Sequence, residues 1–303
     1  MMSNSKTSAE LVLGTARLGE PDINNAEMAT LVLQSAIRAG LRWIETSASY
    51  TASEERIGRA FRSTSQARIV TKLLPLEEVA NARSVRDWAI TQVNRSSMRL
   101  NTSRLDVVAL NSVREMHSHG GTLWRTLKEM RDEGIIFDLG VSVTSPEEAL
   151  QAIDDPNVHY LQLQFNALDW RWREAGVVDA LADRPEVTVH AHSALLYGML
   201  AGAPGNRWPA ADEIDPDALR TTLWQLARDL GRDCPADLCI AYVRAQPWIH
   251  GVIAGAQNVG QLALNLARFN RRALSSSEIA HVNASLPRMP SAMLGAPAVS
   301  RAA

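Results

Sequence analysis

The chain has 303 residues, a formal net charge of -2 and two cysteines, Cys234 and Cys239. A nearly neutral chain lacks the basic excess that a nucleic-acid-binding surface requires, and no run of 18 apolar residues predicts a membrane span. The first residues lack the apolar core of a secretory signal, and the cysteine spacing fits no zinc motif, so a reduced cytoplasmic protein is expected.

Strand-like and helix-like segments alternate along the chain. Apolar runs predict strands at residues 11–14, 41–46, 68–73, 104–110, 137–142, 160–165, 187–192 and 251–255. Apolar residues at helical spacing predict helices at residues 25–40, 53–63, 84–98, 122–134, 145–153, 172–183, 217–231, 235–246 and 258–269. Eight such units favour a closed α/β fold, a (β/α)8 TIM barrel. We expect one barrel domain over residues 1–303, with extra C-terminal helices and a loosely packed tail after about residue 286.

Polar side chains follow the apolar strands at their carboxyl ends, which meet at one mouth of a barrel. Lys72 ends the run RIVTK, so its ammonium is expected to be partly desolvated and to pair with Glu45 on the neighbouring strand. Tyr50 follows five residues after Glu45. A cation beside its phenol would lower the phenol pKa from about 10 and favour proton exchange near neutral pH. The alternatives are a purely structural salt bridge and an ordinary loop tyrosine.

Several segments, in register over about residues 11–270, resemble the motifs of the aldo-keto reductases. They are LVLGTARLG, WIETSASYTASEERIGRA, RIVTKL, RLDVVAL, GVSVTSPEEAL and IAGAQNVGQLALNL. The segments RWREAGVVDAL, VTVHAHSALLYGMLAG and ADLCIAYVRAQPWIHGV are similar to a bacterial branch associated with sugar, polysaccharide or secondary-metabolite biosynthesis. The resemblance implies a barrel enzyme that transfers hydride between NAD(P) and a small carbonyl substrate.

Two of the four catalytic positions that the resemblance implies are altered. The family places Asp, Tyr, Lys and His there, and Tyr50 and Lys72 match the middle two. Glu45 stands in place of Asp and Asn111 in place of His. Glu45 can still pair with Lys72, whereas Asn111 can donate a hydrogen bond to a substrate oxygen but cannot transfer a proton. The expected catalytic set is therefore Tyr50, Lys72, Glu45 and Asn111.

The resemblance also implies a dinucleotide site. The matching residues are Gly14, Thr15, Ser142, Gln162, His192, Ser193, Leu195, Gly198, Gly255, Gln257, Gln261 and Asn265. Ser142 and Gln162 would hold the nicotinamide carboxamide, and His192 would stack on the ring. Many members place Lys or Arg against the 2′-phosphate of NADP, but residues 255–261 carry no charge here. NAD is therefore expected to be preferred over NADP, or discrimination to be weak; an ordinary strand–helix turn is the alternative.

Three functions stay open. The first is an NAD(P)-dependent aldo-keto reductase acting on a small polar metabolite such as a sugar. The second is a catalytically impaired dinucleotide-binding sensor or partner protein, which the changes at Glu45 and Asn111 suggest. The third is a lyase with Lys72 as a Schiff-base nucleophile, which pairing with Glu45 disfavours. His117 and His119 would either replace the missing histidine or be solvated loop residues. No metal, nucleic-acid or membrane partner is expected.

Overall fold

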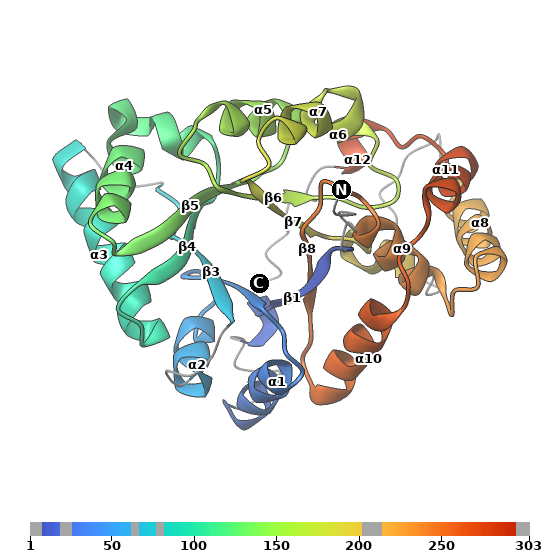
Figure 1. Ribbon diagram of the computed structural model, residues 1–303, viewed down its shortest axis with the longest axis horizontal. Coiled ribbons are helices and arrows are strands. Elements are labelled where there is room, and N and C mark those ends of the chain that lie inside the picture. Colours follow the sequence, from blue (N-terminus) through green and yellow to red (C-terminus); the bar gives the residue numbers. More distant parts are fainter. Residues whose placement is uncertain (1–7, 19–25, 62–66, 77–81, 202–213, 295–303) are drawn as a thin grey trace, which may run out of the picture.

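A closed barrel of parallel strands forms the centre of the computed structural model, which describes residues 8–18, 26–61, 67–76, 82–201 and 214–294 (Figure 1). Its strands are β1 (Glu10–Gly14), β2 (Trp43–Ser47), β3 (Arg68–Lys72), β4 (Leu105–Leu110), β5 (Ile136–Val143), β6 (Tyr160–Gln164), β7 (Thr188–His192) and β8 (Gly251–Gly255). Each strand pairs in parallel with the next, and β8 pairs with β1. The predicted (β/α)8 TIM barrel is thus confirmed.

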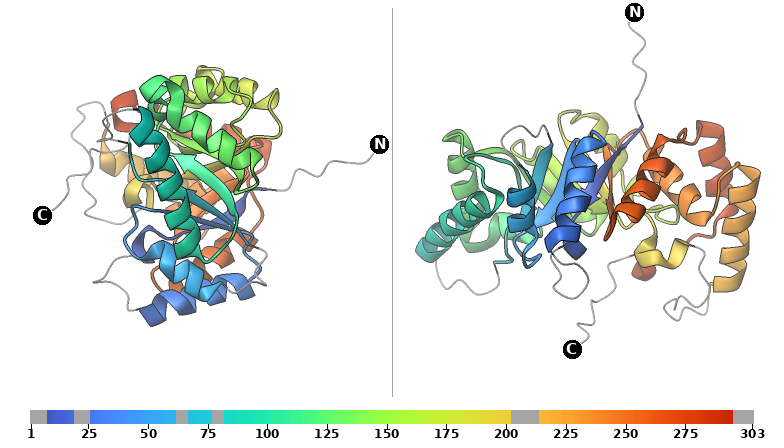
Figure 2. Two further views of the ribbon diagram at one scale, coloured as in Figure 1. Left: turned by 90° about the vertical axis from the view of Figure 1, so that its left-hand side faces the viewer. Right: turned by 90° about the horizontal axis from the view of Figure 1, so that it is seen from below.

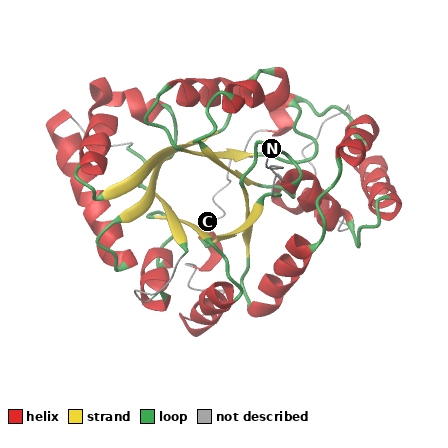
Figure 3. Cartoon of the chain, in the orientation of Figure 1, coloured by secondary structure: helices red, strands yellow, loops and turns green. Residues whose placement is uncertain are grey.

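Helices surround the strands on the outside of the barrel (Figure 3). They are α1 (Ala26–Arg38), α2 (Ser53–Ala60), α3 (Ala82–Leu100), α4 (Arg114–Asp132), α5 (Pro146–Asp154), α6 (Arg171–Glu174), α7 (Val177–Ala182), α8 (Pro216–Asp229), α9 (Pro235–Arg244), α10 (Val259–Asn270), α11 (Ser276–Ser285) and α12 (Ser291–Leu294). Two 3-10 helices, η1 (Ala16–Leu18) and η2 (Leu196–Ala201), follow β1 and β7. Neighbouring helices lie side by side, as α3 and α4 do in Figure 2. The extra C-terminal helices are α11 and α12.

Two helices differ from the sequence-based prediction because glycines interrupt them. A short helical turn at residues 114–117 precedes the helix predicted from residue 122, and residues 118–121, which have non-helical φ/ψ, separate the two within α4. Gly120 and Gly121 have positive φ there, a conformation that costs glycine little. The helix predicted over residues 172–183 is two helices, α6 and α7, because Gly176 adopts φ +80° between them.

Large side chains fill the barrel interior below the carboxyl ends of the strands. Val70, Val107 and Tyr160 pack together there, and Trp43 lies against them. The Tyr160 hydroxyl is 3.2 Å from Nδ1 of the buried His190, and the two rings meet edge to face. This layer forms the floor of the barrel interior, and the polar residues at the carboxyl ends of the strands lie directly above it.

The chain from Leu286 to Leu294 is packed against the barrel, which corrects the expectation of a loose tail for these residues. Met289 and Leu294 are fully buried. Trp170 Nε1 donates to the Met289 carbonyl at 2.8 Å, and Gln164 Nε2 donates to the Leu294 carbonyl at 2.5 Å. These donors lie more than 100 residues away in the sequence, so local composition does not reveal them. Residues 295–303 lie outside the described residues.

Candidate active site

Strand alternation explains how polar residues gather above the floor of the barrel. Side chains two positions apart on a strand point to the same side, so Glu45 follows Trp43 into the interior and Lys72 follows Val70. The same spacing relates Gln162 to Tyr160 and His192 to His190. In the parallel register Ser47 pairs with Lys72, which places Lys72 one inward step above Glu45. The sequence pattern therefore converts directly into a polar layer at the barrel mouth.

Lys72 is the centre of this polar layer. Its Nζ donates to Glu45 Oε1 at 2.6 Å, to the Tyr50 hydroxyl at 3.3 Å and to Gln162 Oε1 at 3.3 Å. A lysine ammonium has three donors, so all of them are used. The Tyr50 hydroxyl in turn donates to Glu45 Oε1 at 3.2 Å. A phenol, an ammonium and a carboxylate from two neighbouring strands and the turn after them are thus in direct contact.

The Glu45 carboxylate keeps Lys72 charged. The Lys72 side chain is only 11% exposed and that of Glu45 only 3%. Burial lowers the pKa of Lys72, but the attraction of Glu45, followed by that of Tyr50, outweighs it and raises the pKa above its ordinary value. Lys72 is therefore a cation at neutral pH and a poor nucleophile, which argues against the lyase hypothesis.

The pKa of Tyr50 is raised, which corrects the expectation that Lys72 lowers it. Burial of the phenol is the largest cause and the Glu45 carboxylate the second; together they outweigh the opposing effect of the Lys72 cation. The sequence pointed to the cation but gave no measure of burial or of the distance to Glu45. The phenol is consequently protonated at neutral pH.

A tight turn after β2 fixes the position of Tyr50. The Tyr50 backbone N–H donates to the Ser47 carbonyl at 2.9 Å, and the Tyr50 carbonyl accepts from Ser53 N at 2.8 Å, where α2 begins. Between them Thr51 adopts φ +38°, a conformation that is strained for a β-branched residue. The turn is connected to β3 by Ala48 N, which donates to the Lys72 carbonyl at 2.8 Å. The Tyr50 backbone is therefore held by hydrogen bonds on both sides.

A cavity of about 250 Å³ opens above this cluster. Its lining consists of Gly14, Ala16, Arg17, Glu45, Tyr50, Lys72, Ser142, Gln162, His192, Ile253 and Gly255. Five of the residues predicted to bind a dinucleotide are among them, namely Gly14, Ser142, Gln162, His192 and Gly255. Their predicted roles stay predictions, but the fold brings them to one cavity with Tyr50 and Lys72.

Other residues of the predicted dinucleotide site lie in the turns after β1 and β7. Thr15 is buried, and its Oγ1 donates to the Glu45 carbonyl at 2.9 Å. Ser193 Oγ is 2.9 Å from His192 Nδ1, and Leu195 and Gly198 follow on the turn that contains η2. None of these four residues lines the cavity itself.

The turn between β8 and α10 bonds to itself. Gln261 Oε1 accepts from Gln257 N at 2.8 Å, and Asn265 Nδ2 donates to the Gly255 carbonyl at 3.0 Å. These hydrogen bonds hold the turn in place, and residues 255–261 contribute no charged side chain to it. They also occupy the Gln261 oxygen and an Asn265 donor in holding the loop.

Asn111 is not part of the cavity lining. Its side-chain Nδ2 donates to the Leu73 carbonyl at 2.8 Å, and its backbone N donates to Glu115 Oε2 at 2.9 Å. Asn111 therefore joins the ends of β3 and β4 in this conformation. His117 and His119 are exposed on the first turn and kink of α4 and do not line the cavity either.

His192 contributes a neutral imidazole to the cavity. Burial, followed by the Lys72 cation, lowers the pKa of His192 to about 4. Its Nδ1 contacts Ser193 Oγ, so at neutral pH the ring carries no charge that would compete with Lys72.

Sequence reasoning missed three lining residues, Ala16, Arg17 and Ile253. Ile253 lies two residues before Gly255 on β8, so strand alternation predicts that both face the barrel interior. Ala16 and Arg17 lie beyond the end of β1 in η1, where no strand or helix period applies. Only the rule that barrel sites use the loops after the strands points to them.

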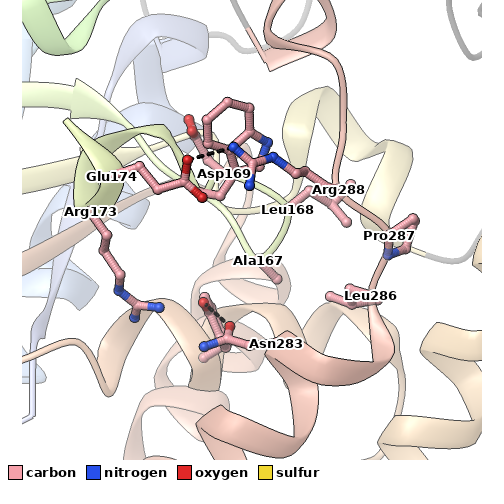
Figure 4. Close-up of a pocket in the computed structure, with 11 residues that line it drawn as sticks. Ala167, Leu168, Asp169, Arg173, Glu174, Asn283, Leu286, Pro287 and Arg288 are labelled. Atoms are coloured by element: carbon pink, nitrogen blue, oxygen red, sulfur yellow. Dashed lines mark hydrogen bonds and ion pairs between the residues drawn. The ribbon is translucent and has the colours of Figure 1, made fainter.

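A second cavity of about 300 Å³ lies near α6, α9 and α11 (Figure 4). Arg288 lies over the Trp170 ring, 3.7 Å from its centroid, and pairs with Glu174. The Tyr242 hydroxyl donates to Asn283 Oδ1 at 2.6 Å. These polar groups bond to one another and thereby attach the C-terminal segment to α6 and α9.

Among the residues described, no group of acidic, histidine or cysteine side chains has the arrangement of a metal site. In the same ranges, no helix combines the length and apolar character that crossing a membrane requires.

Comparisons with known proteins agree with the fold. The model of the Aldo/keto reductase family matches residues 10–287. The uncharacterized oxidoreductase YqkF of Bacillus subtilis is 24% identical over 296 residues, covering 89% of this chain and 90% of the relative. The holo form of the aldo-keto reductase AKR11C1 from Bacillus halodurans superposes with a TM-score of 0.75 at 20% identity, covering 93% of both chains. The Pseudomonas aeruginosa protein PA4992, assigned to the aldo-keto reductases, gives a TM-score of 0.63 at 22% identity, covering 86% of this chain and 90% of the other.

Proposed function

Because the chain belongs to the aldo/keto reductase family of oxidoreductases, we propose that it transfers hydride between NAD(P) and the carbonyl or alcohol of a small polar metabolite. Members of this family generally use NAD(P)H and act on small carbonyl compounds. The resemblance to a branch associated with sugar and secondary-metabolite biosynthesis supports a sugar-like substrate. The two cysteines, which form no disulfide, are compatible with a cytoplasmic location.

The contact between Tyr50 and Lys72 at 3.3 Å carries this proposal. When bound, the reduced dinucleotide supplies a hydride to the carbonyl carbon. The protonated Tyr50 phenol then donates its proton to the carbonyl oxygen, and the nearby Lys72 cation stabilises the phenolate that remains. Glu45 holds Lys72 in place and keeps it charged. In the oxidative direction the same groups act in reverse.

The residues around the cavity are compatible with a dinucleotide. Gly14 and Gly255 pair in the register of β1 and β8, so this rim carries no side chains beyond Cα. A Cβ at Gly14 would lie 2.8 Å from Ile253 Cγ2, which shows how closely the wall is packed. Opposite it, Ser142 and Gln162 pair on β5 and β6 and offer polar side chains. We infer that Ser142 and Gln162 hold the nicotinamide end.

We further propose a preference for NAD over NADP. The turn at residues 255–261 has no cationic side chain, and the Gln261 oxygen is bonded to Gln257 N within the turn. A 2′-phosphate placed against this turn would lack charge-assisted hydrogen bonds. We also expect slow turnover, because Asn111 bonds to the Leu73 carbonyl and cannot supply a proton.

Titration of the purified protein with NADH and with NADPH, followed by nicotinamide fluorescence, tests the proposal. A panel of aldehydes and ketosugars is then added, and oxidation of the cofactor is measured. We expect tighter binding of NADH than of NADPH and measurable oxidation with at least one carbonyl compound. Tight binding without any oxidation would instead support the impaired sensor, and the absence of dinucleotide binding would contradict both.

A further inference from the structure

Arg17 is a cavity residue that neither the catalytic cluster nor the predicted dinucleotide site uses. It lies in η1 just after β1 and lines the same cavity as Tyr50 and Lys72. Its side chain is exposed. Within the described part of the chain it has no hydrogen bond, ion pair or ring contact. Many other arginines here are paired, such as Arg68 with Asp138 and Arg271 with Asp237.

The turn that carries Arg17 is firmly held. Thr15 N donates to the Glu45 carbonyl at 3.0 Å, and Thr15 Oγ1 donates to the same oxygen at 2.9 Å. Leu18 is buried, and its N–H donates to the Thr15 carbonyl at 2.9 Å. Arg56 from α2 donates to the Leu18 carbonyl. The backbone on both sides of Arg17 is therefore fixed relative to Glu45, and the guanidinium emerges from a preorganised position.

The charges in the cavity leave Arg17 uncompensated. Arg17 and Lys72 contribute two positive charges, and Glu45 contributes one negative charge, which leaves one positive charge among the lining residues. Glu45 is committed to Lys72 at 2.6 Å, while His192 and Tyr50 are neutral. The molecule as a whole carries a net charge of -2, so the positive cavity is a local feature. A concave positive site of this kind attracts anions.

We propose that Arg17 binds a carboxylate or phosphate group of the carbonyl substrate. The guanidinium presents a planar set of donors that matches these groups in two-pronged hydrogen bonds. The inference rests on the proposed function in placing the carbonyl at Tyr50. Because Arg17 lines the same cavity as Tyr50, it selects an acidic metabolite over a neutral one.

The test compares two substrates that differ by one charge. They are 4-carboxybenzaldehyde and its neutral methyl ester, reduced by the wild type, Arg17→Gln, Arg17→Lys and Arg38→Gln. Arg38 is an exposed arginine that ends α1, so Arg38→Gln makes the same change of net charge away from the cavity. Each variant is also titrated with NADH, and with benzoate alone in a calorimeter.

If the anion belongs to the substrate, Arg17→Gln lowers kcat/KM for the carboxylate by about tenfold or more, as expected for a lost charge-assisted hydrogen bond. The kcat/KM for the ester and the Kd of NADH stay unchanged, and Arg17→Lys recovers part of the lost kcat/KM for the carboxylate. If Arg17→Gln instead weakens NADH binding and lowers kcat/KM equally for both aldehydes, the anion belongs to the dinucleotide and the proposal is overturned.

The proposal is overturned if Arg17→Gln behaves like Arg38→Gln in every assay. Failure of the proposed reductase function has a different signature, namely a wild type that neither binds NADH nor reduces either aldehyde. In that case the benzoate titration still decides, since binding that is lost in Arg17→Gln supports an anion site, and equal or absent binding contradicts it.

Discussion

Replacing Glu45 with glutamine removes the charge that holds Lys72 as a buried cation. Lys72 Nζ lies 2.6 Å from Glu45 Oε1, and at an effective dielectric constant near 20 this attraction is about 6 kcal/mol before desolvation. Removing one partner of a buried pair leaves the other charge uncompensated and typically costs about 3–5 kcal/mol. Because the Tyr50 hydroxyl and Gln162 Oε1 still accept hydrogen bonds from Lys72, we expect the loss of unfolding free energy to lie near the lower end of this range.

The assay is urea denaturation at several pH values. The pKa of Lys72 is raised above 10.5 in the folded protein, so its contribution to stability is fully present below pH 10.5 and is lost as pH rises through the folded pKa. The difference in unfolding free energy between wild type and Glu45→Gln should therefore have its full size at pH 7 and become smaller as pH rises above 10.5. Glu129→Gln is the matched control, because Glu129 pairs with Arg86 on the exposed surface, where losing the pair should have little effect on the unfolding free energy. Equal losses in the two variants would refute the reasoning.

Two further predictions concern stability. His190 is fully buried, and burial lowers its pKa to about 3, so the unfolded chain binds a proton that the folded chain does not bind between pH 6.5 and about 3. Stability should fall by a few kcal/mol as pH falls through this window, and His190→Gln should flatten the slope in urea denaturation; an unchanged slope would contradict the assignment. Gly58→Ala should lower the unfolding free energy by about 1–3 kcal/mol, because a Cβ at Gly58 would lie 2.1 Å from the Arg99 carbonyl oxygen. Thermal unfolding beside Gly260→Ala, on α10, provides the comparison, and similar effects of both changes would argue against close packing of α2 on α3.

The strand positions and the central contact of the site follow from short-range patterns. The run RIVTK predicts a buried strand with a terminal lysine, and two-residue alternation places Lys72 inside the barrel together with Glu45. Parallel strands end at one mouth, so the convergence of Tyr50, Lys72 and Gln162 follows from topology. These patterns depend on period and strand order, which the sequence carries directly.

Other features depend on distances that the sequence does not carry. The sign of the Tyr50 pKa shift is a balance between burial, Glu45 and Lys72, and only the geometry weighs them. The amide of Asn111 bonds to the Leu73 carbonyl, a contact with a neighbouring strand that no motif indicates. Arg17 lies in an irregular turn, and the tail up to Leu294 is held by side chains of the β6–α6 region.

The rate of cofactor oxidation in Tyr50→Phe tests the central claim most directly. The variant removes only the hydroxyl that contacts Lys72 and Glu45, so it should still bind NADH. With a carbonyl compound that the wild type reduces, NADH oxidation should fall by about 10²–10⁴, the usual contribution of a positioned proton donor. Oxidation at the wild-type rate by Tyr50→Phe, with NADH bound as in the wild type, would contradict the assignment of Tyr50 as the proton donor.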